Sequence, residues 1–350
     1  MKLNQEVGIT AYGVSLPSLA VSFGEIASAN GKDDGVLACP SGIKQKTVPE
    51  QDEDAATLAA AAGQQALLRW QGDVEQIGGI FVGSESHPYA VNPTGTMVKT
   101  ALGLSNQLAL ADLQFACKAG TQGLQIGLSY VAAGMAKNIL AIGADTAQAE
   151  PGDALEFAAG AGAAALLVGK ENLLARVLGT TSYATDTTDF WRRPGQSYPQ
   201  HAGRFTGGPA YFHHVGAAAT QLMTELNLTP ADIDYAVFHT PNAKFPLQVA
   251  QKLGFTKNQV EPSLVVREIG NTYAAASLIA LSSVLDQAEA NQTILLTSYG
   301  SGAGADSFLL ETTPLLVKQR QHWHSLVKDQ VGLLQPVSYQ VYRRNTSHVQ

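Results

Sequence analysis

Residues 74–85 read VEQIGGIFVGSE, a short apolar run that ends in a carboxylate. Apolar runs of roughly four to eight residues are typical of strands buried on both faces of a parallel sheet. A segment rich in Ala, Leu and Gln precedes the run at 52–70 and starts with three acidic residues. Acidic side chains favour the N-terminal end of a helix. The pattern therefore predicts a helix followed by a buried strand.

The same alternation of strand and helix patterns continues along the chain. Further helix-like runs lie at 116–134, 216–226 and 273–286, and further strand-like runs lie at 5–15, 139–143, 163–168, 232–239 and 293–298. This alternation predicts an α/β fold with a mixed, largely parallel sheet covered by helices.

Two spacings in the chain are equal. Glu85 follows the first quoted strand, and Cys117 opens a helix 32 residues later. His239 ends a strand in the second half, and Asn271 precedes a helix, again 32 residues later. This equality favours an internal duplication that brings the four residues together near a pseudo-two-fold axis. We expect an N-terminal half at 1–170 and a C-terminal half at 171–350.

Composition narrows the function classes. With 22 basic and 29 acidic residues, the net charge of −7 argues against a nucleic-acid-binding protein. Charged residues make up 15%, below the usual ~25%, and 34 residues are glycine. We expect large buried subunit interfaces, and hence a homodimer or a larger assembly.

The location is expected to be cytoplasmic. The longest apolar run, 158–168, is much shorter than the ~20 residues of a membrane-spanning helix. Polar residues at positions 4–6 stand where a signal peptide would be apolar, and two cysteines do not make a disulfide framework.

Cys117 is the first candidate for chemistry. It lies in LQFACKAGTQG, between a strand-like run and a helix, where the helix dipole stabilises a thiolate. A thiolate is the nucleophile that acyl transfer needs. The competing interpretation is a small buried core residue, as most free cysteines are. Cys39, in LACPSG, is interpreted as structural.

His239 and Glu85 both follow strands. Residues at the carboxyl ends of strands line the functional crevice of α/β sheets, and His239 is placed there. The pairs His213–His214 and His322/His324 lack ligand spacing, so we expect no metal site. If Glu85 is partly buried, its pKa rises toward neutrality and it can exchange protons.

Two glycine-rich segments, 160–162 and 300–304, permit close backbone approach and are candidate N–H donors to an oxyanion. Neither matches a nucleotide-binding fingerprint, which disfavours nucleotide hydrolysis and NAD chemistry.

Taken together, these segments resemble the thiolase superfamily and, within it, the archaeal-type 3-hydroxy-3-methylglutaryl-CoA synthases. The resemblance rests on GSESHPYAVNPTGT (83–96), FACKAGT (115–121), AIGADTAQAEPGDALE (141–156), TDTTDFWRRPGQSYPQHAGRFTGGPAYF (185–212), DYAVFHTPNAKFPLQVAQKLGF (234–255), GNTYAAASL (270–278) and SYGSGAGAD (298–306). It implies a thiolase fold of two duplicated α/β halves in five αβαβα layers.

The resemblance also implies site residues. Cys117 matches the acyl-accepting nucleophile, Glu85 the general acid/base, and His239 the residue that holds the acetoacetyl-CoA carbonyl. The expected substrate- and CoA-binding positions are Lys244, Asn271, Ser301, Thr121 and Thr146.

The implied reaction joins acetyl-CoA and acetoacetyl-CoA with water, giving 3-hydroxy-3-methylglutaryl-CoA and free CoA for the mevalonate pathway. No metal or redox cofactor is implied. The implied partners are an acetoacetyl-CoA thiolase and a small zinc-ribbon/OB scaffold protein. A carrier-protein-bound ketone stays open as the acceptor. The alternatives are a ketoacyl-carrier-protein synthase, which uses a Cys/His/Asn set, and a non-catalytic thiolase-like subunit; Glu85 discriminates against the first. A thiolase ranks low, because it would need a second catalytic Cys near the C-terminal glycine-rich turn and residues 298–306 contain none.

Overall fold

The computed structural model describes residues 6–32, 41–146, 148–302 and 304–347, without the side chain of Arg204. The interpretation of Cys39 as structural lies outside the described residues. No helix in the described part of the chain is long and apolar enough to cross a membrane.

One mixed sheet organises the described chain, with the strand order β11-β12-β13-β8-β1-β7-β6-β4-β5. These strands are β1 (Gly8–Ser15), β4 (Ile77–Gly83), β5 (Ala109–Leu113), β6 (Asn138–Thr146), β7 (Ala161–Gly169), β8 (Ala175–Ala184), β11 (Tyr235–Phe238), β12 (Thr293–Thr297) and β13 (Gly304–Thr312).

Two groups of strands in this sheet share the same pattern of parallel and antiparallel pairing. In the first group, β4 is parallel to β6, and β7 is antiparallel to both β6 and β1. In the second group, β11 is parallel to β12, and β13 is antiparallel to both β12 and β8. The groups meet where β1 and β8 pair through two residue pairs, Gly8–Arg176 and Ile9–Ala175. The 170/171 boundary expected from the sequence falls between β7 and β8.

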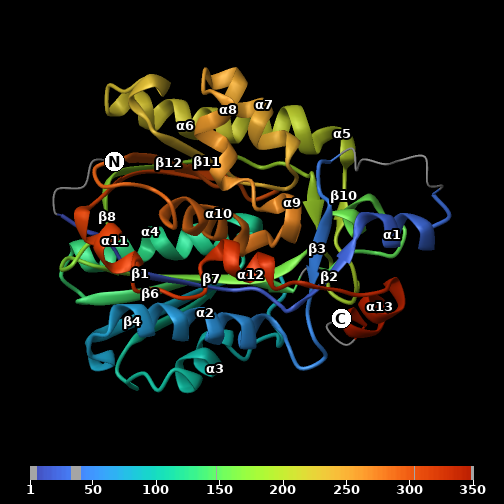
Figure 1. Cartoon of the computed structure of the whole chain (residues 1–350), viewed down its shortest axis with the longest axis horizontal. Helices are drawn as coiled ribbons and strands as arrows, with labels where there is room; N and C mark the ends of the chain where they lie inside the picture. Colours follow the sequence, from blue (N-terminus) through green and yellow to red (C-terminus); the bar gives the residue numbers. More distant parts are fainter. Residues whose placement is uncertain (1–5, 33–40, 147, 303, 348–350) are drawn as a thin grey trace.

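The two groups stack as layers, because β1 and β8 pair only briefly and the sheet turns there (Figure 1). Helices α4 and α10 lie between the two parts of the sheet, and other helices cover the outer faces. The helices are α2 (Ala55–Trp70) and α3 (Thr94–Ala101) on one outer face, α4 (Ala119–Ala132) and α10 (Ala276–Leu285) in the middle, and α6 (His213–Glu225), α7 (Lys244–Leu253) and α8 (Lys257–Val260) on the other.

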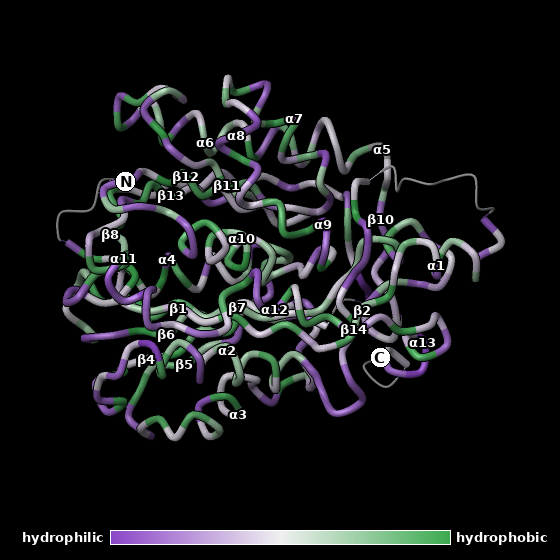
Figure 2. Tube along the Cα trace, in the orientation of Figure 1, coloured by the Kyte–Doolittle hydropathy of each residue, from purple (hydrophilic) through white to green (hydrophobic). Residues whose placement is uncertain are grey.

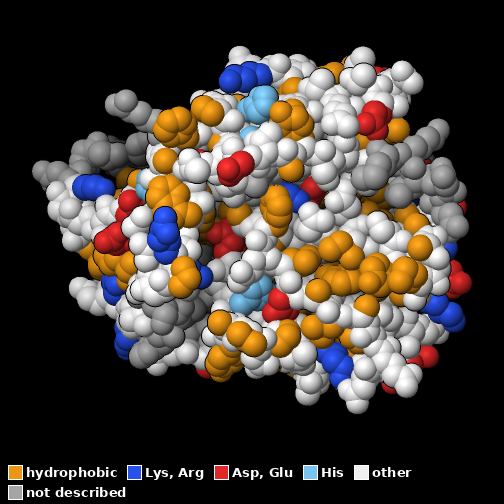
Figure 3. Space-filling model, turned by 180° about the vertical axis from the view of Figure 1, so that it is seen from behind, with side chains coloured by type: hydrophobic (Ala, Val, Ile, Leu, Met, Phe, Trp, Pro, Cys, Tyr) orange, Lys and Arg blue, Asp and Glu red, His pale blue; other side chains and the backbone are white. Residues whose placement is uncertain are grey.

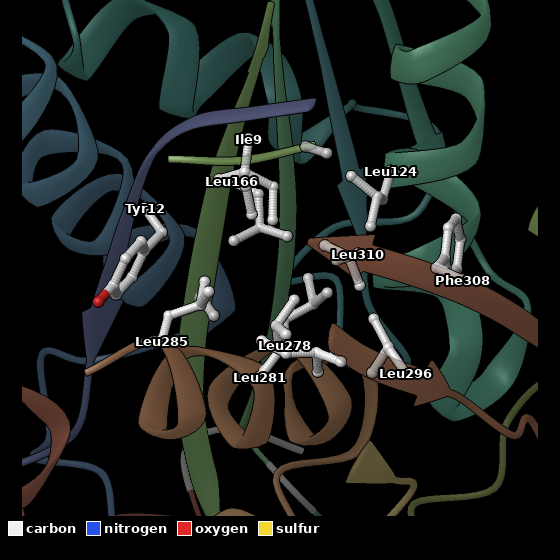
Figure 4. Close-up of a cluster of buried hydrophobic side chains, with 14 of the residues drawn as sticks. Ile9, Tyr12, Leu124, Leu166, Leu278, Leu281, Leu285, Leu296, Phe308 and Leu310 are labelled. Carbon is white, nitrogen blue, oxygen red and sulfur yellow. The ribbon is translucent and has the colours of Figure 1, made fainter. Parts of the chain in front are cut away.

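The central core lies around α4 and α10. Leu124, Leu166, Leu278 and Phe308, which come from both helices and both sheet parts, converge there (Figure 4). Figure 2 shows α10 as largely hydrophobic, as expected for a helix that is covered on both sides. A Cβ on Gly143 would lie 2.3 Å from the carbonyl oxygen of Ala274, so the close packing in the middle requires glycine there.

A smaller sheet and several short helices flank the layers. The sheet has the order β14-β2-β3, in which β2 is parallel to β14 and antiparallel to β3. The flanking elements are β2 (Leu19–Ser22), α1 (Phe23–Ala29), β3 (Gln45–Val48), α9 (Val266–Ile269), α11 (Pro314–Arg320), α12 (Val327–Gly332), β14 (Gln335–Pro336) and α13 (Tyr339–Thr346). Buried Lys46 of β3 donates to the hydroxyl of Tyr342 at 3.0 Å, which fixes α13 to this sheet.

Helix starts differ from the predicted ranges by a few residues. The helix predicted from residue 52 begins at Ala55, because the Asp54 side chain accepts the N–H of Thr57 at 2.8 Å and caps the helix.

The 3-10 helices η2 (Ala116–Lys118) and η7 (Tyr273–Ala275) precede α4 and α10. Both begin at a residue with positive φ, 44° at Ala116 and 49° at Tyr273.

The equal spacing of 32 residues does not make Cys117 and Asn271 equivalent positions of the two halves. The structure places Cys117 in the middle of η2, whereas Asn271 lies two residues before η7, and Ala274 holds the middle position. The spacing matched because the connections before the two helices differ in length.

Candidate active site

Cys117 lies in η2 at the start of α4, just after the strained backbone of Ala116. Its side chain is buried, with 6% exposed. The Sγ atom donates to Oε1 of Glu85 at 3.0 Å. Glu85 follows the carboxyl end of β4, so the neighbouring strand and helix bring the nucleophile and the carboxyl together, as the sequence predicted.

Glu85 carries a strongly shifted carboxyl. Burial raises its pKa to about 8, and the nearby charge of Asp145 adds to the rise. The hydrogen bond from Cys117 and the charge of Arg192 act in the opposite direction. At neutral pH the carboxyl is therefore mostly protonated and can exchange a proton within the physiological range.

Asp145 is a site residue that the sequence analysis missed. It is the second-last residue of the buried strand β6 and is itself 1% exposed. Its Oδ1 accepts the N–H of Glu85 at 2.8 Å, and its Oδ2 accepts the N–H of Ala274 at 2.8 Å. Ser84 and Ser86 also donate their hydroxyls to Oδ1, at 2.8 and 2.6 Å. An acidic residue at the end of an apolar run was the available signal, the same that identified Glu85.

The thiol of Cys117 differs from the expectation. A helix start was expected to favour the thiolate, but burial raises the pKa of the thiol well above its usual value, and Glu85 and Asp145 raise it further. Burial, together with two carboxyl groups at close range, outweighs the helix terminus. The resting side chain is a thiol whose proton points at Glu85.

His239 follows β11 and is 1% exposed. Tyr211 donates its hydroxyl to the backbone carbonyl of His239 at 2.7 Å, and Ser277 Oγ lies 3.4 Å from Nδ1. Burial lowers the pKa of the imidazole to about 3, so the ring is neutral at physiological pH. A neutral imidazole donates one hydrogen bond without bringing a charge into the site.

A cavity of about 80 Å³ is lined by both Cys117 and His239. It is lined by Cys117, Leu155, Phe190, His201, Thr206, Tyr211, His239, Pro241, Phe245, Asn271, Tyr273, Tyr299 and Ser301. A larger cavity of about 400 Å³ lies on the Glu85 side, and Phe190, Tyr273 and Ser301 line both. The contact between Cys117 and Glu85 thus lies between the two cavities.

Asn271 and Ser301 are brought to the nucleophile as expected, since both line the small cavity. The Oδ1 atom of Asn271 accepts the N–H of Tyr273 at 2.9 Å, which leaves the amide NH₂ as the group available for a ligand.

The other three expected binding residues line neither cavity. Lys244 is exposed at the start of α7. Buried Thr121 donates to Ser298 Oγ at 2.7 Å, behind the nucleophile. Buried Thr146 donates its N–H to Ser86 at 3.0 Å, and its hydroxyl has no partner in the described part of the chain.

The glycine-rich turn after β12 is closed by its own backbone. Gly300 and Gly304 bond each other through N–H and C=O, at 2.7 and 3.1 Å. The N–H of Gly302 donates to Asp189 at 2.6 Å. The expectation that this segment donates N–H groups to an oxyanion is wrong for Gly300, Gly302 and Gly304, because their N–H groups already donate to acceptors within the protein. A Cβ on Gly300 would lie 2.5 Å from the carbonyl of Phe115, so the glycine lets the turn approach the nucleophile.

A buried ion pair lies beside the nucleophile. Lys118 Nζ is 2.8 Å from Oδ2 of Asp306 in β13, and both side chains are almost fully buried. Lys118 also donates to Gln122 at 2.6 Å and lies over the ring of Phe115. The pair connects the nucleophile's helix in the first strand group to a strand of the second. No cluster of His, Cys, Asp or Glu fit to hold a metal ion occurs among the described residues.

The five layers and a cysteine at a helix start, facing a glutamate and a histidine from corresponding strands, define a thiolase-fold condensing enzyme. The chain is 51% identical over 318 residues to a hydroxymethylglutaryl-CoA synthase of Methanopyrus kandleri, covering 91% of each, and 53% identical over 307 residues to one of Archaeoglobus fulgidus, covering 88% and 89%. The chain belongs to the hydroxymethylglutaryl-CoA synthase family.

Other comparisons agree with this family. The 3-oxoacyl-[acyl-carrier-protein] synthase III model matches residues 111–186, and its C-terminal model matches 223–312. A solved structure of MvaS in complex with 3-hydroxy-3-methylglutaryl coenzyme A is 25% identical, with a TM-score of 0.88 over 98% of this chain and 92% of that one. A curacin-pathway HMG synthase in complex with apo donor-ACP is 23% identical, covers 99% and 89%, and shares the fold with a TM-score of 0.88.

Proposed function

We propose that this chain is an acyltransferase that condenses acetyl-CoA with acetoacetyl-CoA and water to give 3-hydroxy-3-methylglutaryl-CoA and CoA, through an acetyl-S-Cys117 intermediate. Membership of the synthase family supports the reaction. The observation that carries the residue assignment is the 3.0 Å contact between the Cys117 thiol and the Glu85 carboxyl, beside a cavity that His239 also lines. The product feeds the mevalonate pathway.

Each step uses one of these side chains. Cys117 accepts the acetyl group from acetyl-CoA. The ionised form of Glu85 then removes a proton from the acetyl methyl. A carboxyl whose pKa is raised by burial to about 8 is a stronger base than an ordinary glutamate. The neutral ring of His239 donates a hydrogen bond to the ketone of acetoacetyl-CoA, so that the carbanion attacks a polarised carbonyl. Water finally releases the product from Cys117, and none of these steps needs a metal or a redox cofactor.

The ketoacyl-carrier-protein synthase alternative is disfavoured by the position of Glu85. Decarboxylative condensation does not require a base for a methyl group, yet this carboxyl accepts the hydrogen bond of the nucleophile. A non-catalytic subunit is disfavoured because Cys117, Glu85 and His239 are all present and close together.

Substrate binding is proposed for Asn271 and Ser301 in the small cavity and for Lys244 at the CoA phosphates. Lys244 is exposed and its neighbour Phe245 lines that cavity, so the ammonium group is within reach of a ligand at its mouth. Thr121 and Thr146 would act indirectly, through the buried groups they contact.

A second copy of the chain is the first proposed partner. The edge strand β5 has its outer side unpaired in the described chain, and its residues are only half-buried. Figure 3 shows hydrophobic side chains gathered in a band on the face seen from behind. Sedimentation at micromolar concentration should give a homodimer or a larger assembly, and a stable monomer would contradict this proposal.

The remaining proposals rest on the resemblance alone. They are an acetoacetyl-CoA thiolase and a zinc-ribbon/OB scaffold protein as partners, a cytoplasmic location, and free acetoacetyl-CoA as the acceptor. Co-purification of the three tagged proteins tests the assembly.

The direct experiment is to incubate the pure protein with both CoA esters and to follow free thiol and product. Release of CoA together with 3-hydroxy-3-methylglutaryl-CoA supports the proposal. CoA release that requires malonyl-carrier protein instead would support the ketoacyl-synthase alternative, and no release with either would support the non-catalytic subunit.

A further inference from the structure

A second imidazole lines the cavity of Cys117, and the steps above do not use it. His201 lies on β10 (Gln200–His201), which pairs with β9 (Phe190–Trp191) at the cavity wall. Its Nε2 atom is 3.2 Å from both carboxylate oxygens of Asp153. Asp153 caps η3 (Ala154–Phe157) and accepts the N–H of Leu155 at 2.7 Å. A histidine oriented by a fixed carboxylate is an arrangement found in general bases.

The carboxylate determines which ring nitrogen is basic. Partial burial of Asp153 acts to raise its pKa, but the hydrogen bonds from Leu155 and His201 outweigh it, and the pKa lies below the usual value. Asp153 is therefore ionised and can only accept hydrogen bonds. In the neutral ring the Nε2 atom of His201 therefore carries the hydrogen toward Asp153, and Nδ1 carries the lone pair.

A buried hydroxyl lies at the same cavity. Thr206 lines it, and its Oγ1 atom is buried without a hydrogen-bond partner in the described part of the chain. A buried hydroxyl without a partner is costly, and such groups in proteins call for an explanation such as a water or a ligand. Thr206 begins the π-helical segment η4 (Thr206–Phe212), and π-helical turns are frequent at functional sites.

The last step of the reaction, hydrolysis of the thioester, needs a general base that activates water. Condensation leaves the product joined to Cys117 as a thioester, which water must cleave. In the steps proposed above, Glu85 serves the methyl proton and neutral His239 serves the ketone. A base for water has to face the thioester from the small cavity.

We propose that His201, oriented by Asp153, is the general base for the water that hydrolyses the Cys117 thioester, and that Thr206 positions this water. The water oxygen forms a bond to the thioester carbonyl carbon while one of its protons passes to Nδ1 of His201. The carbon–sulfur bond then breaks, its electron pair goes to Cys117, and the imidazolium returns the proton to the sulfur. The second water proton leaves when the new carboxylic acid ionises.

The inference rests on the proposed function, and trapping of intermediates tests it. His201→Gln should still form the acetyl-enzyme and the carbon–carbon bond but lose hydrolysis by roughly 10²–10⁴-fold, the range for one general base. Mass spectrometry of the quenched protein should then show the condensed product, still carrying CoA, accumulated on Cys117. Asp153→Asn and Thr206→Val should accumulate the same adduct to a smaller extent. His213→Gln, at an exposed histidine on α6, is the matched control.

The outcomes separate this inference from the proposed function. If the wild type takes no acetyl group on Cys117, the proposed function fails. If the wild type turns over but His201→Gln hydrolyses the Cys117 thioester as fast as the wild type does, only the role of His201 is wrong. The same holds if His201→Gln stops at the acetyl-enzyme. If His201→Gln does not fold, the two other variants decide, and turnover without adduct in both overturns the inference.

Discussion

The thiol of Cys117 donates a hydrogen bond of 3.0 Å to the carboxyl of Glu85, and each group shifts the pKa of the other in the opposite direction. After burial, Glu85 is the largest cause that raises the pKa of the thiol. For Glu85, whose pKa is raised mainly by burial and Asp145, the bond from the thiol acts to lower it. Replacing Glu85 therefore changes the nucleophile as well as the base, and the two effects are separable by measuring the half-reactions.

Glu85→Gln should keep acetyl-enzyme formation and lose condensation by about 10²–10⁴-fold. Glutamine still accepts from the thiol, and the loss of the charge makes the thiolate easier to form, but it cannot take a methyl proton. Exchange of the acetyl methyl protons with deuterated water should disappear. Exposed Glu150→Gln is the control. A variant that fails to acetylate, or that condenses normally, would show that Glu85 is not the base.

The stability of the fold should depend on pH through Glu85. Burial raises its pKa from 4.5 to about 8, so the folded state binds this proton more tightly than the unfolded chain does. Ionisation therefore weakens the fold as pH rises from about 4.5 through about 8. The Tm of Glu85→Gln relative to the wild type should be higher at pH 9 than at pH 5. Exposed Glu75→Gln should show no such trend, and an equal difference at both pH values would contradict the shift.

Cys117→Ala should take up no radiolabel from acetyl-CoA, whereas the wild type should hold one acetyl group per active chain. The prediction follows from the position of the thiol at the cavity beside Glu85. Peptide analysis locates the label. Label on Cys39, or label that persists in the variant, would refute the assignment of the nucleophile.

His239→Ala should leave acetylation intact and lower kcat/KM for acetoacetyl-CoA, by roughly 10²-fold for the loss of one preorganised donor. His239→Gln, which keeps an N–H donor, should recover part of this loss. Because burial holds the pKa of the ring at about 3, no limb of the pH profile between pH 5 and 8 should disappear in either variant. The disappearance of such a limb would show that the imidazole titrates in the working range.

Lys244→Ala should raise KM for acetyl-CoA by roughly tenfold, as expected for a charge-assisted contact with phosphate. KM for a short pantetheine thioester, which lacks the nucleotide phosphates, should change little. Lys257→Ala, at an exposed lysine that begins α8, should leave both values unchanged. Equal increases for both esters in Lys244→Ala would point to a structural effect.

Local sequence patterns were sufficient to predict the alternation of strands and helices that builds the layers, and to identify part of the candidate site. Apolar runs predicted strands such as β4 and β6, and the residues that follow strands identified Glu85 and His239, because ligand sites of α/β sheets lie outside the carboxyl ends of the strands. The direction of the thiol pKa shift was not predictable, since it depends first on burial and then on Glu85 and Asp145, and only the fold sets the burial and brings these carboxyl groups close. His201 was missed for a similar reason, as only the fold brings its hairpin to Asp153.

The ion pair between Lys118 and Asp306 has a consequence for how the protein is made. Asp306 is incorporated 188 residues after Lys118, so the lysine leaves the ribosome without its counter-charge. Burying a charge without its partner is strongly unfavourable. We therefore expect the segment that carries Cys117 to stay solvated until β13 has been translated. The reactive pocket would then be completed late in biogenesis, and a chain truncated before β13 would lack a finished acyl-binding site.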